Sequence, residues 1–203
     1  MYQRTIKLTI ICLFIATQSV FGQVKTYKGE LYSVVYSEDY EQPLEVTYVV
    51  MCSTGEISRK GMNFWKPVGW KTSDNDDYKS NIYDKGHMAP AAAFNCYDKQ
   101  TLNETFNYLN CALQHESLNR GPWKELERFE RDLSKVFEKV KVNVTIHFNN
   151  EPEYVAGGAQ IPSGFTKVIW AGKNEWTFYF DNINLKGRDW SNFQIPNKRP
   201  LSE

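Results

Sequence analysis

The sequence is poor in the residues that build zinc sites, and it has no long apolar run. Its 203 residues include four cysteines and three histidines, with no Cys-x-x-Cys pair. A structural zinc site needs about four such ligands at short spacings, so this class of site is disfavoured. An uncharged apolar stretch at residues 8–16 is far shorter than the ~20 residues of a membrane-spanning helix, and no later segment is long enough either.

The sequence also lacks an excess of charge of either sign. It has 24 Lys+Arg and 24 Asp+Glu residues, so its overall field does not attract a polyanion, and contact with nucleic acid requires a local basic patch. A hydrophobic fraction of 41% and an aromatic fraction of 15% are typical of a globular chain that buries a core. At ~150 residues per domain, the length predicts one domain.

The N-terminus carries the pattern of a secretory signal peptide. Arg4 and Lys7 precede the apolar stretch, and small or branched residues stand three and one positions before Gln23. This order of a basic, an apolar and a cleavage region predicts the removal of residues 1–22. The mature protein is then residues 23–203, a single domain of 203 − 22 = 181 residues. We expect it to be secreted or periplasmic, with no membrane span.

Three cysteines stay in this predicted mature protein: Cys52, Cys96 and Cys111. In the oxidising surroundings of an exported protein, one disulfide and one free thiol are expected. The sequence does not choose among the three pairings.

Apolar patterning predicts several strands and one long helix. The helix begins at Gly121-Pro122, since proline is tolerated in a first turn, and its apolar residues recur at steps of three and four as far as Val140. Strands before, around and after one helix indicate an α+β fold, a layered mixed domain around a largely antiparallel central sheet. The predicted strands are residues 31–36, 44–51, 104–111, 141–148, 165–170 and 175–180.

Three clusters carry residues suited to chemistry. The first is Tyr83–Pro90, in which a histidine lies close to a cation and a glycine; the second is Asn110; the third runs from Asn119 to Glu127. Asn119, Trp123 and Glu127 step by four residues, a drift of only ~40° per step on a regular helix, so an amide and a carboxylate face one region. Taken singly, a histidine is more often structural and an asparagine at a helix start is more often a cap.

Together, and in this order, the clusters resemble the motifs of the DNA/RNA non-specific endonucleases, which are ββα-metal (His-Me finger) nucleases related to mitochondrial endonuclease G. The matching residues are Asp84-Lys85-Gly86-His87-Met88-Ala89-Pro90-Ala91, Thr105-Phe106 through Asn110 to Gln114, and Leu118-Asn119 through Trp123 to Leu126-Glu127. The resemblance covers roughly residues 30–196. It implies that the His-bearing segment, the Asn110 strand and the Asn119 helix form a ββα finger.

The resemblance also implies roles for individual residues. A phosphodiester is hydrolysed by an activated water, and a neutral imidazole takes up the proton of that water. A hard divalent ion, Mg²⁺ with Mn²⁺ or another divalent cation as the alternative, prefers oxygen ligands and keeps several waters. The implied roles are His87 as base, Asn119 as metal ligand, Glu127 on the metal's water shell, Asn110 as a supporting polar residue, Lys85 and Arg59 as phosphate clamps, and Arg120 and Lys124 as nucleic-acid contacts.

Two positions depart from the family pattern. Lys85 replaces the usual arginine, which keeps the charge and loses the planar two-pronged grip on phosphate. Leu113 replaces a proline near the site.

The expected function is a secreted, metal-dependent endonuclease that cuts DNA and RNA with little sequence preference, because contacts to phosphate carry no base information. Two alternatives stay open: a degenerate module that binds nucleic acid without cutting it, and a nuclease toxin with a cognate inhibitor protein. A purely structural exported domain leaves three ordered motifs unexplained.

Overall fold

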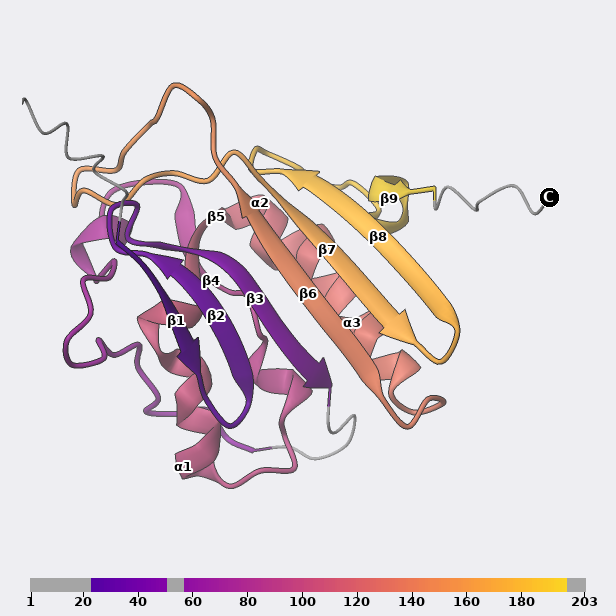
Figure 1. Ribbon diagram of the computed structural model, residues 1–203. Helices are drawn as coiled ribbons and strands as arrows, with labels where there is room; N and C mark the ends of the chain where they lie inside the picture. The colour runs from indigo at the N-terminus through magenta and orange to yellow at the C-terminus, as the bar shows by residue number, and fades with distance from the viewer. Residues whose placement is uncertain (1–22, 51–56, 197–203) are drawn as a thin grey trace, which may run out of the picture.

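A computed structural model describes residues 23–50 and 57–196 of the chain. The predicted signal peptide and Cys52 lie outside these residues. Within them, a seven-stranded antiparallel sheet has the order β1-β2-β3-β6-β7-β8-β9 (Figure 1). Its strands are β1 Val24–Lys28, β2 Tyr32–Ser37, β3 Gln42–Val50, β6 Val140–His147, β7 Gly164–Ala171, β8 Asn174–Asp181 and β9 Gln194–Ile195.

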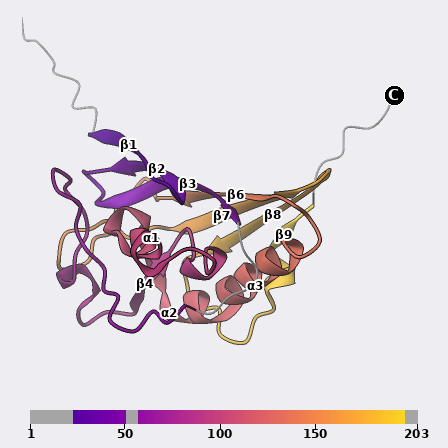
Figure 2. The ribbon, with the colours of Figure 1, turned by 90° about the horizontal axis from the view of Figure 1, so that it is seen from below.

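A second, two-stranded sheet and three α-helices lie on one face of the large sheet (Figure 2). These elements are β4 Tyr83–His87, β5 Cys111–His115, α1 Lys99–Leu102, α2 Glu116–Leu118 and α3 Lys124–Leu133. The observed architecture confirms the predicted α+β class with a largely antiparallel central sheet.

Alternation of side chains explains why the strands form a layer. In β6 the buried positions are Val140, Val142, Val144 and Ile146, and the residues between them are partly or fully exposed. This period of two is typical of a strand with one covered face. Each such buried valine or isoleucine contributes about 1.5–3 kcal/mol to stability by leaving water. The core therefore lies between the large sheet and the helical layer.

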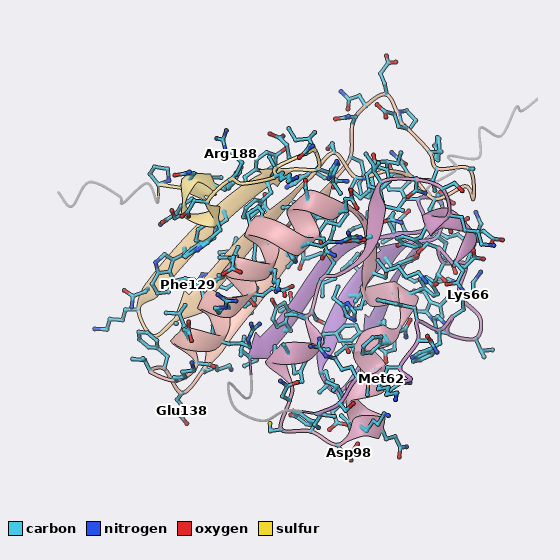
Figure 3. All side chains as sticks on the ribbon, turned by 180° about the vertical axis from the view of Figure 1, so that it is seen from behind. Met62, Lys66, Asp98, Phe129, Glu138 and Arg188 are labelled. Carbon is cyan, nitrogen blue, oxygen red and sulfur yellow. The ribbon has the colours of Figure 1, made fainter. Side chains whose placement is uncertain are left out.

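The longest of these helices, α3, lies on the same face of the large sheet. Figure 3 shows α3 crossing the sheet from behind, with Phe129 labelled on it. The Phe129 ring packs against Trp190, with ring centroids 5.0 Å apart, and against Trp176 at 5.6 Å. The C-terminal segment thus contributes Trp190 to the cover of α3.

Two predicted elements are wrong. Residues 104–111 do not form one strand: 3₁₀ turns occupy Asn103–Phe106 and Tyr108–Asn110, and β5 begins only at Cys111. The long helix ends at Leu133, since Val136 is 78% exposed and Val140 already belongs to β6. Val140, which extends the helical pattern, instead begins the two-residue period of the following strand.

Candidate active site

The first motif forms β4 and pairs with β5 in an antiparallel register that sets His87 opposite Cys111 and Asp84 opposite Gln114. Successive side chains of a strand point to opposite faces. Lys85 and His87 therefore share one face of β4, and Asp84 lies on the other. Gly86 has no room for a side chain, because a Cβ there would lie 2.5 Å from Oε1 of Gln114.

His87 lies between two phenylalanine rings. Its ring centroid is 4.8 Å from that of Phe64 and 4.9 Å from that of Phe106. Burial, with the nearby charge of exposed Arg59 as a smaller cause, lowers the pKa of His87 to about 4. The imidazole is therefore neutral at neutral pH, as a proton acceptor must be.

One of the two ring nitrogens of His87 is left open in the described part of the chain. Nε2 is buried and has no hydrogen-bond partner among the described residues. A buried polar atom of this kind is uncommon and marks a site where water, an ion or a substrate group completes the structure.

Lys85 is partly buried, and its ammonium lies among three aromatic rings. Its ammonium lies 5.4 Å from the ring centroid of Tyr108 and 5.6 Å from those of Phe64 and Tyr78, and it donates to Oδ1 of Asn75. The negative faces of aromatic rings attract a cation. The lysine charge is thus held two residues along β4 from the imidazole, on the same face of the strand.

Asn110 is a fully buried residue whose amide is used by the backbone. Its Oδ1 accepts from the N–H of Ala89 at 2.7 Å, and its Nδ2 donates to the carbonyls of Ala89 at 2.8 Å and Thr105 at 2.9 Å. These bonds tie the segment after His87 to the turn before β5. Asn110 lies in that turn and not in a strand, which corrects its predicted placement.

On the other face of β4, Asp84 holds the predicted metal ligand. Nδ2 of Asn119 donates to Oδ2 of Asp84 at 2.9 Å, so the amide oxygen is the end that stays available. Arg120 donates to both oxygens of Asp84, at 2.8 and 2.6 Å, and pairs with Glu116 at 3.2 Å. We did not assign a role to Asp84 from the sequence, although its place at the head of the Asp-x-Gly-His motif was the available signal.

The start of the helix is irregular, which corrects the predicted four-residue alignment. Residues Asn119–Trp123 form a π-type turn in which Gly121 has non-helical φ −106° and ψ −114°. Trp123 is fully buried, with its ring 5.5 Å from Phe165 and 5.8 Å from Phe180. The regular helix α3, with Glu127 in its first turn, begins only after this bend.

Glu127 is partly buried. Burial raises the pKa of Glu127 to about 7, and the neighbouring charge of Lys167 acts against this rise. Arg131, one helical turn further on, also lowers the pKa of Glu127. The spacing of four residues between Glu127 and Arg131 was the signal in the sequence for this missed neighbour.

The two residues predicted to contact nucleic acid differ in their surroundings. Lys124 is exposed at the start of α3, whereas the exposed guanidinium of Arg120 is occupied by two carboxylates. The structure thus brings Asp84, Asn119 and Arg120 together on one face of β4 and places Lys85 and His87 on the other, with Arg59 near His87. It places Glu127 on α3.

The cysteines do not form a reactive group in the described part of the chain. Cys111 is a buried free thiol whose sulfur lies 3.1 Å from the hydroxyl of Tyr78, and burial raises its pKa to about 12. Cys96 is disulfide-bonded. A free Cys111 rules out the two pairings that include it, and Cys52 lies outside the described residues.

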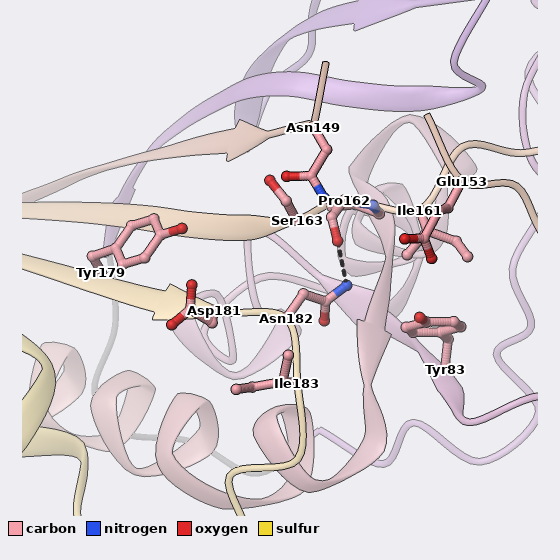
Figure 4. A pocket seen from close by; sticks show the side chains of 10 residues that line it. All are labelled: Tyr83, Asn149, Glu153, Ile161, Pro162, Ser163, Tyr179, Asp181, Asn182 and Ile183. Atoms are coloured by element: carbon pink, nitrogen blue, oxygen red, sulfur yellow. Dashed lines mark hydrogen bonds between the residues drawn. The ribbon is translucent and has the colours of Figure 1, made fainter. Parts of the chain in front are cut away.

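A cavity of 360 Å³ begins one residue before Asp84, at Tyr83 (Figure 4). Tyr83 and Glu153 lie on one side of it, and Tyr179 and Asp181 lie on the other. Its floor is formed by buried Asn182, which donates to the carbonyls of Pro162 and Leu113 at 2.8 and 3.0 Å. None of the predicted site residues lines this cavity.

Comparisons with known proteins agree with the motifs. A family model described as DNA/RNA non-specific endonuclease matches residues 13–200. The chain is 35% identical to mitochondrial Endonuclease G of Bos taurus over 68 residues, which is 34% of this chain and 22% of the relative. It is 38% identical to mitochondrial Nuclease EXOG of Danio rerio over 91 residues, 43% of this chain and 26% of the relative. The chain thus spans about a quarter of the length of these curated relatives.

Two further similarities concern secretion and fold. A salivary endonuclease of Lutzomyia longipalpis is 37% identical over 59 residues, 29% of this chain and 14% of the relative. A crystal structure of the EndoG/EndoGI complex superposes with a TM-score of 0.74 at 24% identity, covering 84% of this chain and 80% of that one. The second similarity is one of fold. No helix in the described residues is long and apolar enough to span a membrane.

Proposed function

Because this chain belongs to the DNA/RNA non-specific endonuclease family, we propose that it hydrolyses phosphodiester bonds of DNA and RNA with little sequence preference. The observation that supports this most directly is the state of His87. Its pKa of about 4 leaves the imidazole unprotonated at neutral pH, beside the charge of Arg59. A neutral base next to a cation is the combination that activates a water against a phosphate.

In the proposed reaction, His87 accepts a proton from the attacking water. Arg59 and Lys124 bind phosphate oxygens, and Lys85 adds positive charge from within its aromatic surroundings. Asn110 acts as a positioning residue, because all its bonds go to the backbone on either side of the His87 segment. Asp84 orients the Asn119 amide, and Arg120 retains its proposed contact with nucleic acid in addition to its pairing with Asp84.

The residues on α3 and at its start fit a hard divalent ion. The donor set is the amide oxygen of Asn119, left available by the bond from Nδ2 to Asp84, and the carboxylate of Glu127. No cluster of three or more His, Cys, Asp or Glu side chains suited to a metal occurs in residues 23–50 and 57–196. A single amide with an outer carboxylate suits Mg²⁺, which keeps most of its waters. When bound, the ion supplies Lewis-acid stabilisation of the departing 3′ oxygen.

The proposal is tested with purified protein, plasmid DNA and total RNA. Both substrates should be degraded with Mg²⁺ and stay intact with EDTA. The Asn119→Ala variant should lose the metal-dependent activity, and its retention at the same Mg²⁺ concentration would refute the ligand. A second asparagine offers a control: Asn143, which donates to Glu45 and Thr47 on the large sheet, should tolerate alanine.

A second candidate function is a module that binds nucleic acid without cutting it. It is favoured by one observation, the enclosure of Lys85 by three rings and Asn75, which limits its reach toward phosphate. Retention of intact plasmid in a mobility-shift assay, equal with Mg²⁺ and with EDTA, would support this function against hydrolysis.

We also propose that residues 1–22 are removed on export and that residues 23–203 act as one secreted or periplasmic domain. Mass spectrometry of the N-terminus of protein recovered outside the cytoplasm tests this. A mature chain that begins at Gln23 is expected, and an intact Met1 in exported material would contradict it.

A further inference from the structure

A buried ion pair lies beneath the helix that follows Asn119. Nζ of Lys167, on β7, lies 2.7 Å from Oε1 of Glu130, on α3, and both side chains are fully buried. The hydroxyl of Tyr48, on β3, donates to the other oxygen of Glu130 at 2.6 Å. The three polar groups thus join the central strands of the large sheet to the helix.

Both charges stand where the sequence pattern calls for apolar residues. Lys167 lies between Phe165 and Ile169 on the covered face of β7, and Glu130 follows Leu126 by four residues on the covered face of α3. Removing such a pair from water carries a desolvation cost that often exceeds the attraction between the charges. The pair is therefore a poor device for stability alone.

The cation has a second contact, which leads toward the candidate site. Nζ of Lys167 lies 3.9 Å from the ring centroid of Trp123. Trp123 ends the irregular turn Asn119–Trp123, and Asp84 holds the opposite end of this turn through Asn119 and Arg120. Gly121 has non-helical φ and ψ, so the shape of the turn depends on what holds its two ends.

We propose that Lys167 is a positioning residue for the turn that carries Asn119. The ammonium fixes the Trp123 ring. Through this chain of contacts, Lys167 sets where the Asn119 amide and the Glu127 carboxylate lie relative to each other. The inference rests on the proposed function for the importance of Asn119, but the positioning itself is measurable without metal or substrate.

The test replaces the whole polar network at once, with the triple variant Lys167→Met, Glu130→Leu, Tyr48→Phe. No buried charge or hydroxyl is then left unpaired, and replacements of this kind often keep or raise stability. Hydrogen exchange is measured by mass spectrometry in EDTA, and Mn²⁺ affinity is measured separately by paramagnetic resonance. The control is Lys141→Met, which removes a cation 5.4 Å from the Trp170 ring on the same sheet.

The expected result is local. The variant should melt within a few degrees of the parent, with amide exchange at least ten-fold faster in residues 116–124 and unchanged in β4, β5 and β7. Its Mn²⁺ dissociation constant should rise by about ten-fold or more, the usual effect of losing a group that orients a metal ligand. The Lys141→Met protein should match the parent in both measurements.

Two results would overturn the inference: unchanged exchange in residues 116–124 of a stable triple variant, or faster exchange spread evenly over the sheet. If the triple variant does not fold, Trp123→Phe decides, because it keeps the ion pair and an aromatic ring but weakens the attraction for the cation. It should show the same local change in smaller degree, and no change would overturn the inference. If the parent protein neither cuts nucleic acid nor binds Mn²⁺, the proposed function is refuted. The hydrogen-exchange result then still decides whether Lys167 positions the turn.

Discussion

On one face of β4 the charged groups are paired with each other, whereas on the other face they lie among aromatic rings. Asp84 is shared by Asn119 and Arg120 at 2.6–2.9 Å. Lys85 and His87 lie two residues apart on the same strand, and both contact the ring of Phe64. The strand thus separates two environments that differ in the way charge is balanced.

The difference shows how each environment suits a separate task. Paired charges and hydrogen bonds fix the direction of a side chain, so the Asp84 face determines which end of the Asn119 amide stays available. Aromatic surroundings remove water without supplying a counter-charge, so the other face keeps the His87 imidazole neutral. The proposed reaction needs both an oriented ligand and an unprotonated base.

The largest expected effect comes from the aromatic face. His87→Ala should reduce plasmid cleavage by about 10²–10⁴-fold, the usual contribution of a general acid or base, with little change in melting temperature. The control is His147→Ala, since that ring bonds Thr166 on the large sheet. Cleavage by the His87 variant at the parent rate would contradict a catalytic role for His87.

A smaller loss is expected from the paired face. Asp84→Asn removes the charge that holds Arg120 and weakens the bond that orients Asn119, so the Mg²⁺ concentration for half-maximal cleavage should rise by about ten-fold. Asp132→Asn is the matched change, because Asp132 pairs only with Lys135 in an exposed i,i+3 bridge. An unchanged Mg²⁺ requirement would mean that Asp84 fixes Arg120 but does not orient Asn119.

The pH dependence of His87 tests the aromatic face directly. Phe64→Leu lessens the burial of the imidazole, so its pKa should rise from about 4 toward the ordinary 6.5, measured by NMR titration of the ring protons. Cleavage at pH 5 should fall, because more of the base is then protonated. The comparable Phe129→Leu change on α3 should leave the titration where it is.

The same pKa makes a prediction about stability in the parent protein. Between pH 6.5 and 4 the unfolded chain binds a proton at His87 that the folded chain does not, so the free energy of unfolding should fall as the pH is lowered through this window. In Phe64→Leu the slope should be shallower. Equal free energies of unfolding at pH 7 and pH 5, measured by denaturant titration, would show that the environment of His87 does not depress its pKa.

The smallest effect is expected at the position where the chain departs from its family. Lys85→Arg restores the planar guanidinium, but the three rings and Asn75 already enclose the cation, and such contacts are worth about 0.5–1 kcal/mol each at partly exposed sites. We expect cleavage to change by only a few-fold. Lys141→Arg, over Trp170, controls for the substitution itself, and a gain well above ten-fold at position 85 would indicate that the guanidinium reaches phosphate.

The strands that the sequence predicts well share a covered face. β2, β3, β6, β7 and β8 repeat apolar residues every second position, because one side of each packs on the helical layer. β1 is less regular, with only partial burial of its inner residues, and it was missed. The end of α3 was misplaced because helical and strand periods overlap between Leu133 and Val140.

The site was predictable in its residue types but not in its connections. Ordered motifs led to His87, Asn119 and Glu127, since their chemistry recurs at those spacings. Glu130 and Lys167 were not found, although each interrupts an apolar face, because a charge at such a position has meaning only when its partner is known. The bend at Gly121 was also missed, since its φ and ψ are imposed by contacts at both ends of the turn.

By itself, the amino-acid order of this protein determined its family, its α+β class and the identity of the groups available for chemistry, since these depend on local periodicity and on motif spacing. Only the tertiary structure decided which groups share an environment. Whether His87 is neutral, which end of the Asn119 amide is available and what holds Trp123 all depend on residues 28 to 44 positions away along the chain. Burial and pairing are properties of neighbours in space, and for these the chain order carries no direct signal.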